Sequence, residues 1–444
     1  MERVAPKPLD YDDVLPISID AKSSRREFFP EGGSIYGPSG GTHPNIIRIP
    51  VNADSMLDAS NSYIKCELTN THSGHTLGLD TPQSWIKRVR ITSGGVVLED
   101  INSYNRLYGG ILYPSQASTG LVAENSVANG GNFTSNVGGS GSLNSLAITG
   151  NKNDQVADGA SKTLTFHLAC GFLNLQTYLP LVMMNAGFII EIELDNAGSI
   201  GVSNSNFITN SFEISDVRYV AHLIDLQRDF YDRLRMIMDG SAGVLQMSGT
   251  TYRHYSGQFP SNATNASINI PARVKSIKSI LFKNTIEADI NVLASADAAY
   301  GVSNAPTHGI TEYQFRIGSV SYPPNSVKVS ATNKGEAYQE LRKAFGTLGD
   351  YQHGGILLNN SSYLASATAN AGSLAVPHFA PYGLDFESFP RSATESGVNS
   401  ADRSLAITLE LTATAAAVLT TVDCFVMCDA VFYVNMDGTC SVSV

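Results

Sequence analysis

The chain has 444 residues and a mass of 47.4 kDa, which is too long for one ordinary core and suits two packed units of about 200 residues each. Its net charge is −11, and its longest run of basic residues is the pair Arg25-Arg26, so the sequence lacks the clustered basic face that enclosing nucleic acid directly requires. Only 16% of the residues are charged, against about 25% in a typical protein. This low fraction suits either a surface buried against neighbouring subunits or a β-rich protein with Ser, Thr and Asn loops.

Residues 1–44 predict an extended N-terminal arm rather than a domain. They contain six prolines and no sustained periodicity, so they cannot bury a core of their own. Two alternatives stay open, an arm that orders against a neighbour and a frayed terminus. The segment lacks the apolar stretch of a secretory signal, and no run in the chain approaches the ~18 apolar residues of a membrane span. We therefore expect a protein that is not secreted by way of a signal peptide.

Residues 45–226 predict a first all-β unit. Alternating polar and apolar side chains between turn residues indicate strands, and these segments are 45–51, 63–68, 85–91, 96–101, 163–168, 188–194 and 212–224. Residues 102–112 have apolar side chains at helical spacing and predict a short helix. Residues 114–160 are rich in Gly, Ser, Asn and Ala and predict a long loop.

A helix is expected to link this unit to a second one. Residues 227–238 have one apolar stripe and end before Gly240, a suitable helix end, so we place the linker helix at 227–242. Residues 243–444 then predict a second all-β unit with strands at 244–259, 267–282, 313–320, 405–411 and 422–434, a helix at 335–345 and a polar loop at 349–376. We expect Pro323-Pro324 to stop the strand that begins at Tyr313.

The two units look like copies of one another. Arg90-Ile91 ends a strand that is followed by a turn and a helix, and Arg316-Ile317 has the same surroundings in the second unit. Residues 190–194 match residues 407–411 in the same way. Two tandem units of about eight strands, each with a helix in its first long connection, indicate a double jelly roll. We expect Arg90 and Arg316 to pair with acids of their own unit.

In this layout the chain resembles the double jelly-roll major capsid proteins of icosahedral DNA viruses, and in particular their polinton-like virus and virophage branch. Each motif is degenerate alone, and the order of the motifs over residues 45–440 carries the resemblance. The similar segments are LPL at 179–181 before 189–194, YQFRIGS at 313–319 with YPP at 322–324, EAYQEL at 336–341, FA at 379–380, DFES at 385–388, SGVN at 396–399, and DAVF at 429–432 before Asp437-Gly438.

The resemblance implies a structural protein of the virion, not an enzyme. It implies a homotrimer with a pseudo-hexagonal outline, which packs against neighbouring trimers in the capsid and meets minor capsid and penton proteins. The arm 1–44 would then lie low in the shell and contact neighbours or an internal membrane, and the loops 114–160 and 349–376 would form towers or clasps. No cofactor, metal or catalytic residue is implied, and direct sequence-specific contact with nucleic acid is not expected.

Few residues suggest chemistry. The chain has only five cysteines, and five is an odd number, so they do not indicate a disulfide framework. Cys424 and Cys428 share one strand face, but two further zinc ligands are not obvious nearby, so we interpret them as buried thiols. His72 and His75 lie in a turn without a matching carboxylate pair, which makes a metal site there a weak hypothesis.

Paired carboxylates and the aromatic content leave two other classes of protein to weigh. Asp385 and Glu387 have the spacing for acid–base work or calcium binding, although a structural role is the commoner one. A carbohydrate- or receptor-binding viral spike or fibre is the main alternative, but it favours clustered exposed aromatics, and the only tryptophan, Trp85, lies in a strand pattern. A hydrolase on a jelly-roll or cupin scaffold would need a convergent His/Glu set, whereas the nine histidines are scattered.

Overall fold

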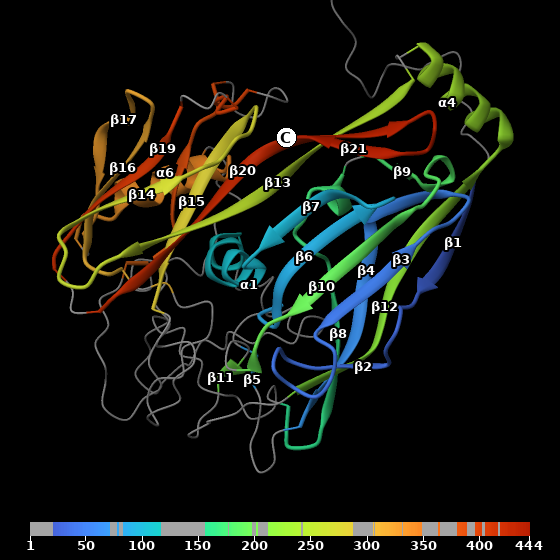
Figure 1. Cartoon of the computed structure of the whole chain (residues 1–444), viewed down its shortest axis with the longest axis horizontal. Coiled ribbons are helices and arrows are strands. Elements are labelled where there is room, and N and C mark those ends of the chain that lie inside the picture. Colours follow the sequence, from blue (N-terminus) through green and yellow to red (C-terminus); the bar gives the residue numbers. More distant parts are fainter. Residues whose placement is uncertain are drawn as a thin grey trace, which may run out of the picture.

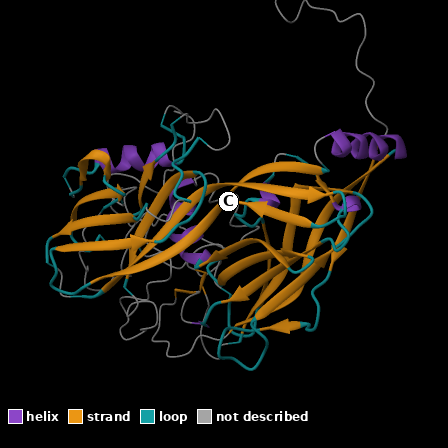
Figure 2. Ribbon diagram, turned by 45° about the horizontal axis from the view of Figure 1, so that its top comes forward, coloured by secondary structure: helices purple, strands orange, loops and turns teal. Residues whose placement is uncertain are grey.

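A computed structural model describes most of the chain. The described residues are 21–71, 78–79, 83–116, 156–175, 177–197, 201–202, 212–240, 243–286, 305, 307–330, 332–348, 363–364, 380–388, 396–401, 405–415 and 418–444. The strands form two bodies that lie side by side along the long axis of the molecule (Figures 1 and 2). Most of the predicted loops 114–160 and 349–376, and both His72 and His75, lie outside the described residues.

The first body is a sandwich of two antiparallel sheets. One sheet has the order β1-β12-β4-β8, and the other has the order β3-β10-β6-β7. The bounds in the first sheet are β1 (Ala21–Phe28), β12 (Phe212–Leu226), β4 (Met56–Asn70) and β8 (Ser161–Phe166), with β2 (Ile35–Tyr36) on β12 and β9 (Leu179–Pro180) on β4. Those in the second sheet are β3 (Ile46–Val51), β10 (Phe188–Leu194), β6 (Ile86–Ser93) and β7 (Val96–Asn102).

Short helices and one small ribbon complete the first body. The predicted helix at 102–112 is a tandem of α1 (Tyr104–Leu107), the short π-helix η2 (Tyr108–Leu112) and α2 (Tyr113–Gln116). Two 3-10 turns, η3 (Phe172–Asn174) and η4 (Leu181–Met183), follow β8 and β9, and β5 (Gly78–Leu79) pairs with β11 (Gly201–Val202).

The second body repeats this arrangement. Its sheets have the orders β13-β20-β15-β18 and β14-β19-β16-β17. The bounds are β13 (Val244–Phe259), β20 (Thr420–Asn435), β15 (Ile277–Thr285), β18 (Tyr382–Asp385), β14 (Asn265–Ile270), β19 (Ile407–Ala413), β16 (Ile310–Ile317) and β17 (Val320–Lys328), with β21 (Cys440–Ser443) on β20. Helix α6 (Gly335–Ala344) lies between β17 and β18, and helix α4 (Arg228–Gly240) connects β12 of the first body to β13 of the second.

The internal duplication holds down to the register of paired residues. The strand orders match one for one: β1 takes the place of β13, β12 of β20, and β10 of β19. Ile190 lies opposite Ile91 in the first body, and Ile407 lies opposite Ile317 in the second. These are the residues that the sequence comparison equates, so both bodies place the same repeat positions in the same sheet contacts.

The structure corrects the expected boundary at residue 45. Residues 21–28 and 35–36 of the predicted arm form β1 and β2, and both pair with β12. The duplication also requires β1, because its counterpart β13 is the first strand of the second body. The strand was missed because it is a sheet edge whose residues 21–26 are all exposed, so its sequence carries no alternation between polar and apolar side chains.

Two strand predictions also needed correction. Pro323-Pro324 does not end a strand but lies inside β17. Because β17 is at the edge of its sheet, its outer side has no neighbouring strand and requires no backbone N–H donor, so proline is tolerated there. The side-chain amide of Gln314 donates hydrogen bonds to the carbonyl oxygens of Pro323 (2.7 Å) and Pro324 (3.2 Å). The segment 267–282 is two strands, β14 and β15, which belong to different sheets.

Each body has its own aromatic core. Trp85 is 1% exposed and contacts Phe166 edge-on, with 5.5 Å between the ring centroids. In the second body Phe282 stacks on Tyr382 at 4.8 Å and meets Tyr313 edge-on at 5.3 Å. The single tryptophan is therefore a core residue and not part of an exposed binding surface.

Candidate functional site

The contact between the two bodies is the most elaborate polar site in the described residues, and we call it the seam. The long strands β13 and β20 run out of the second body and, with β21, lie over the end of the first (Figures 1 and 2). From the first body, β7 and η3 meet them, Arg106 of α1 reaches β20, and η2 contacts β15. The seam therefore joins residues that lie far apart in the sequence.

Glu99 of β7 is a buried carboxylate that binds groups from both bodies. Its carboxylate oxygens accept hydrogen bonds from the backbone N–H groups of Gly171 (2.8 Å) and Phe172 (3.0 Å), both of the first body. The Thr251 hydroxyl of β13 donates a third bond at 2.6 Å. Burial raises the pKa of Glu99, and these three hydrogen bonds oppose that rise. The side chain thus ties the first long strand of the second body to the turn at η3.

A second buried carboxylate, Asp423 of β20, forms the polar centre of the seam. Arg106 of α1 donates to it at 3.1 Å, His254 Nε2 lies 2.9 Å away, and the Thr285 hydroxyl donates at 2.7 Å. Burial alone would raise the pKa of Asp423, but the hydrogen bond from His254 and the charge of Arg106 outweigh it and hold the pKa at about 2. Asp423 is therefore ionised, and its ion pair with Arg106 connects the second body to the first.

Apolar packing and close backbone contact complete the seam. Phe172 lies edge-on between Phe188 of its own body (5.3 Å) and Phe432 of β20 (5.2 Å). Gly171 packs so closely on β13 that a Cβ atom would overlap the carbonyl oxygen of Thr250. A glycine is needed here because two backbones meet directly. Such contacts fix the angle between the bodies more firmly than long side chains would.

The Asp437-Gly438 motif lies in the turn between β20 and β21 and closes the other side of the seam. The backbone N–H of Asn185 donates to the carbonyl oxygen of Gly438 at 3.1 Å, and the Asn185 side-chain amide donates to that of Asp437. Gly438 has a φ of 78°, a conformation that favours glycine. The Asp437-Gly438 turn therefore joins the second body to Asn185 of the first.

The two arginines of the duplicated strands pair within their own bodies, as expected. Arg90 lies 3.6 Å from Glu191 on the neighbouring strand β10. Arg316 lies 3.4 Å from Glu410 on β19. Both are pairs across neighbouring strands on an outer sheet face.

Asp385 and Glu387 are engaged in structural contacts. The Asp385 carboxylate accepts the backbone N–H of Glu387 at 3.0 Å, and burial raises its pKa. Lys278 Nζ lies 3.2 Å from Glu387 and 3.7 Å from Asp429. The two carboxylates are thus separated by their partners rather than aimed at one point.

All five cysteines are free and buried. Burial raises the pKa of Cys424 and raises that of Cys428 to about 12, so both are neutral thiols in the body of the second roll. Among the described residues no group of three or more His, Cys, Asp or Glu side chains is arranged to hold a metal ion. No helix in the described part of the chain is both long and apolar enough to cross a membrane.

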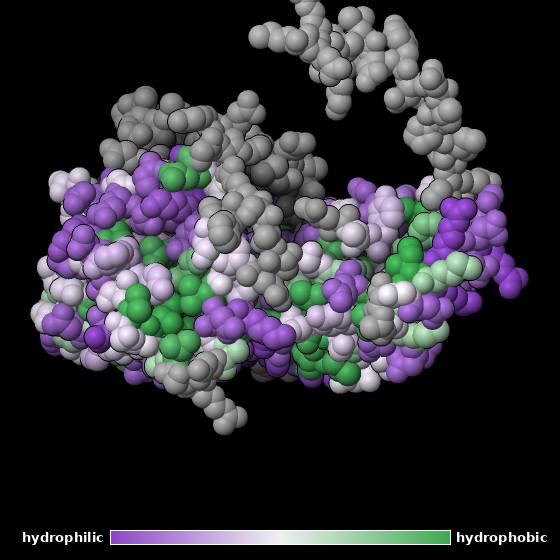
Figure 3. Space-filling model, turned by 90° about the horizontal axis from the view of Figure 1, so that it is seen from above, coloured by the Kyte–Doolittle hydropathy of each residue, from purple (hydrophilic) through white to green (hydrophobic). Residues whose placement is uncertain are grey.

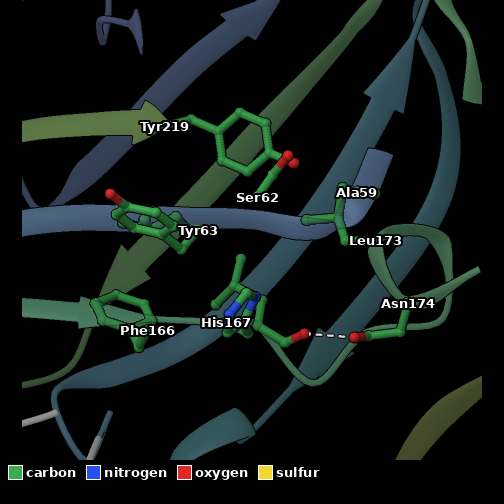
Figure 4. A pocket seen from close by; sticks show the side chains of 10 residues that line it. Ala59, Ser62, Tyr63, Phe166, His167, Leu173, Asn174 and Tyr219 are labelled. Atoms are coloured by element: carbon green, nitrogen blue, oxygen red, sulfur yellow. Dashed lines mark hydrogen bonds between the residues drawn. The ribbon is translucent and has the colours of Figure 1, made fainter. Parts of the chain in front are cut away.

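A small pocket lies in the first body between β4, β8 and η3 (Figure 4). It is lined by side chains that include Tyr63, His167, Asn174 and Tyr219. The Asn174 amide donates to the carbonyl oxygens of Leu168 and Cys170, both at 2.7 Å. The Asn174 amide is therefore committed to the fold on this side of the pocket.

Comparison with solved structures identifies the fold. VP54 of PBCV-1, from a crystal structure fitted into a cryo-EM reconstruction of the virophage Sputnik, superimposes with a TM-score of 0.63 and 12% identity, over 98% of this chain and 99% of that one. The Faustovirus major capsid protein gives 0.55 and 9% identity over 95% and 92% of the two chains. The mavirus major capsid protein gives 0.51 and 10% over 100% and 95%. The chain is a double jelly roll.

No protein-family model matches the chain, and no curated protein matches it either. The similarity spans both jelly rolls and nearly the full length of each neighbour, so it applies to the arrangement of the two rolls and not to a single sandwich.

Sequence reasoning missed the seam residues Glu99, Arg106 and Asp423. The sequence does contain a signal for Asp423, because this charged residue lies inside the apolar run 422–434. A buried charge needs a partner, so an ion pair or hydrogen-bonded site could have been predicted there. Its partner Arg106 was not predictable, since 317 residues separate the two in sequence.

Proposed function

We propose that this protein is the major capsid protein of an icosahedral virus, a structural subunit without catalytic activity. The observation that carries the proposal is the full-length likeness of both jelly rolls to chains that are themselves major capsid proteins. The seam supports it, because a shell tile has to keep a fixed angle between its two rolls. Glu99, Arg106 and Asp423 supply that rigidity through buried, directional contacts.

The proposed working unit is a homotrimer. Three copies of a chain with two similar rolls give six similar walls, and hence a pseudo-hexagonal block that tiles a surface. Obligate interfaces of this kind bury on the order of 2,000–5,000 Å². We propose the first roll at 21–226, a linker helix within 227–242 and the second roll at 243–444, since α4 lies between the last strand of one and the first strand of the other.

Further partners follow from the same proposal. The virion is the proposed location, and neighbouring trimers, minor capsid proteins and penton proteins are the proposed contacts of the block. Residues 1–20 precede β1 and are proposed to face neighbours or an internal membrane. The acidic net charge of −11 disfavours direct binding of nucleic acid by the folded body. Assembly inside the host cell, without a secretory signal, belongs to this proposal.

Shell formation is the direct test of this function. Because blocks that carry like net charge repel one another, association between trimers should increase as added salt screens the charge. We expect electron micrographs of the purified protein at rising ionic strength to show arrays or shells of hexagonal units. A protein that stays dispersed at every ionic strength and instead binds defined sugars on a glycan array would favour the receptor-binding spike.

A further inference from the structure

A buried histidine lies in the turn that leads into β16 of the second roll. His308 is 8% exposed, and its ring packs on that of Phe259, the last residue of β13, with 4.7 Å between the ring centroids. Within the described part of the chain its Nε2 atom is buried and has no hydrogen-bond partner, and the same is true of the hydroxyl of Thr420. Thr420 lies opposite Phe259 on β20. This end of the second roll, which β13 reaches as it runs away from α4 (Figure 1), therefore holds a polar ring in an apolar setting.

Hydrogen bonds from two neighbouring segments hold this turn. The Asn284 side-chain amide of β15 donates to the carbonyl oxygen of Thr307 at 3.2 Å. The backbone N–H of Thr414, which follows β19, donates to the carbonyl oxygen of Gly309 at 2.9 Å. His308 itself has a φ of 49°, a left-handed conformation that a residue other than glycine keeps only where its surroundings hold it. Opening of the turn would therefore relax the backbone and bring the ring into water.

The first roll has a neutral amide in the turn before its corresponding strand. Gln83 precedes β6, which takes the place of β16, and it is also buried with a positive φ of 63°. Its side chain is engaged at both ends, because the Tyr104 hydroxyl donates to its Oε1 at 2.6 Å and its Nε2 donates to the carbonyl oxygen of His167 at 3.0 Å. An imidazole takes up a proton near neutral pH and an amide does not. The two turns therefore differ in their response to acid.

The charges of the elements packed against the turn are used elsewhere. The nearest titratable or charged side chain along each of these elements is Tyr255 on β13, Lys283 on β15, Glu312 on β16, Glu410 on β19 and Asp423 on β20. Glu312 pairs with Lys328 and Glu410 with Arg316. The charge of Lys283 acts on Asp423 in the seam, and burial keeps Tyr255 neutral by raising its pKa. Burial lowers the pKa of His308, and none of these charges offsets it.

Charges at the surface of this roll are hydrated, since hydrophilic side chains cover much of it in the view from above (Figure 3). A proton on His308 would instead place a charge among apolar groups, which is unfavourable unless the group is paired or reaches water. We infer that the turn 307–309 is an acid-sensitive latch, which closes this end of the second roll at neutral pH and opens when His308 is protonated. The inference goes beyond the proposed function and applies to this double jelly roll whatever its role.

The direction of the pH dependence follows from burial. A histidine that resists protonation in the folded protein contributes stability that is fully present above the unfolded pKa of about 6.5. That contribution is lost as the pH falls below this value, because the open form takes up the proton. The latch therefore weakens in mild acid, whereas the ion pair of Asp423 in the seam, with a pKa of about 2, is unaffected there.

Amide hydrogen exchange of the full-length protein at pH 7.5 and pH 5.5 measures the opening. Once intrinsic exchange rates are corrected for, peptides that cover 307–317 should lose protection at the lower pH, by up to about tenfold for one added proton. His308→Gln copies the amide of the first roll and should give equal protection at both pH values. The matched control is His167→Gln, which removes an exposed histidine and should keep the wild-type response.

A second measurement uses the wild-type protein and does not depend on the folding of a variant. Exchange of the imidazole C2 hydrogen, followed by mass spectrometry across a range of pH, gives the titration midpoint of each histidine. The midpoint of His308 should lie below the value of about 6.5 for free histidine. A midpoint at or above this value, equal wild-type protection at the two pH values, or a His308→Gln variant that keeps the wild-type response would each overturn the inferred latch.

Discussion

The buried ion pair Arg106–Asp423 gives the most quantitative prediction for the seam. The two side chains are 18% and 0% exposed, with 3.1 Å between nitrogen and oxygen. Asp423→Asn keeps the shape of the side chain and removes its charge, so Arg106 loses its anion. Removing one partner of a buried pair costs about 3–5 kcal/mol, and we expect the free energy of unfolding to fall by about this amount.

A double-mutant cycle separates the pair from its surroundings. Arg106→Met keeps the apolar stem of the arginine and removes its charge. The double variant should lose less than the sum of the two single variants, with a coupling of about 1–3 kcal/mol. The matched control is the exposed pair Arg316–Glu410, whose side chains are 53% and 43% exposed. Arg316→Met should cost less than about 1 kcal/mol.

Urea unfolding is the suitable assay, because urea does not screen charge as guanidinium does. Trp85 is the only tryptophan and is buried in the first roll, so its fluorescence reports the unfolding of that roll, while circular dichroism follows both rolls. Loss of the ion pair should separate the two transitions, since the seam couples the rolls. Additive single effects, or a loss from Asp423→Asn no larger than that of the exposed pair, would refute the reasoning.

The same carboxylate predicts a dependence on pH. The pKa of Asp423 is lowered from 3.8 to about 2 in the folded protein. A lowered pKa contributes stability that is fully present above the unfolded value and is lost as the pH falls from about 3.8 toward 2. The contribution at neutral pH is roughly 2 kcal/mol, and Asp423→Asn should remove this part of the acid sensitivity. An unchanged acid midpoint in the variant would contradict the assignment.

Three further predictions concern the seam and the first strand. Gly171→Ala should destabilise the protein by about 1–3 kcal/mol or more, because its Cβ meets the backbone of β13, while Gly240→Ala has nothing within 4 Å and should be neutral in the same thermal melt. Glu99→Ala should cost about 1–3 kcal/mol for each backbone N–H that it leaves unpaired, and Glu99→Gln should cost less in parallel urea titrations. Deleting residues 1–28 removes β1 and should lower the melting temperature, whereas deleting residues 1–20 should not; equal melting temperatures for the two deletions would show that β1 contributes nothing to the first roll.

Elements set by local side-chain patterns were predictable from the sequence. The strand 188–194 alternates between buried and half-buried residues along its whole length, and the structure gives it the predicted bounds. The duplication was readable for the same reason, since both copies keep the apolar positions that face the sheet partner. The structure places Ile91 and Ile317, which the sequence equates, opposite Ile190 and Ile407 at equivalent positions of the two sheets.

Elements that depend on distant contacts were not predictable. β1 has no alternation because its side chains face solvent, and only pairing with β12 makes it a strand. Pro323-Pro324 predicts the end of a strand, because proline is excluded from central strands. The position of β17 at the edge of its sheet, which makes the prolines acceptable, is not visible in the sequence. The seam depends on Arg106 and Asp423 coming together from different rolls, which no local pattern records.

The mass of the purified protein in solution tests the central claim most directly. Light scattering, with negative-stain images of the same chromatographic peak, should give three times the chain mass of 47.4 kDa and compact hexagonal outlines. A stable single chain of 47.4 kDa at all concentrations would contradict the capsid subunit, because a double jelly roll that does not associate cannot tile a shell.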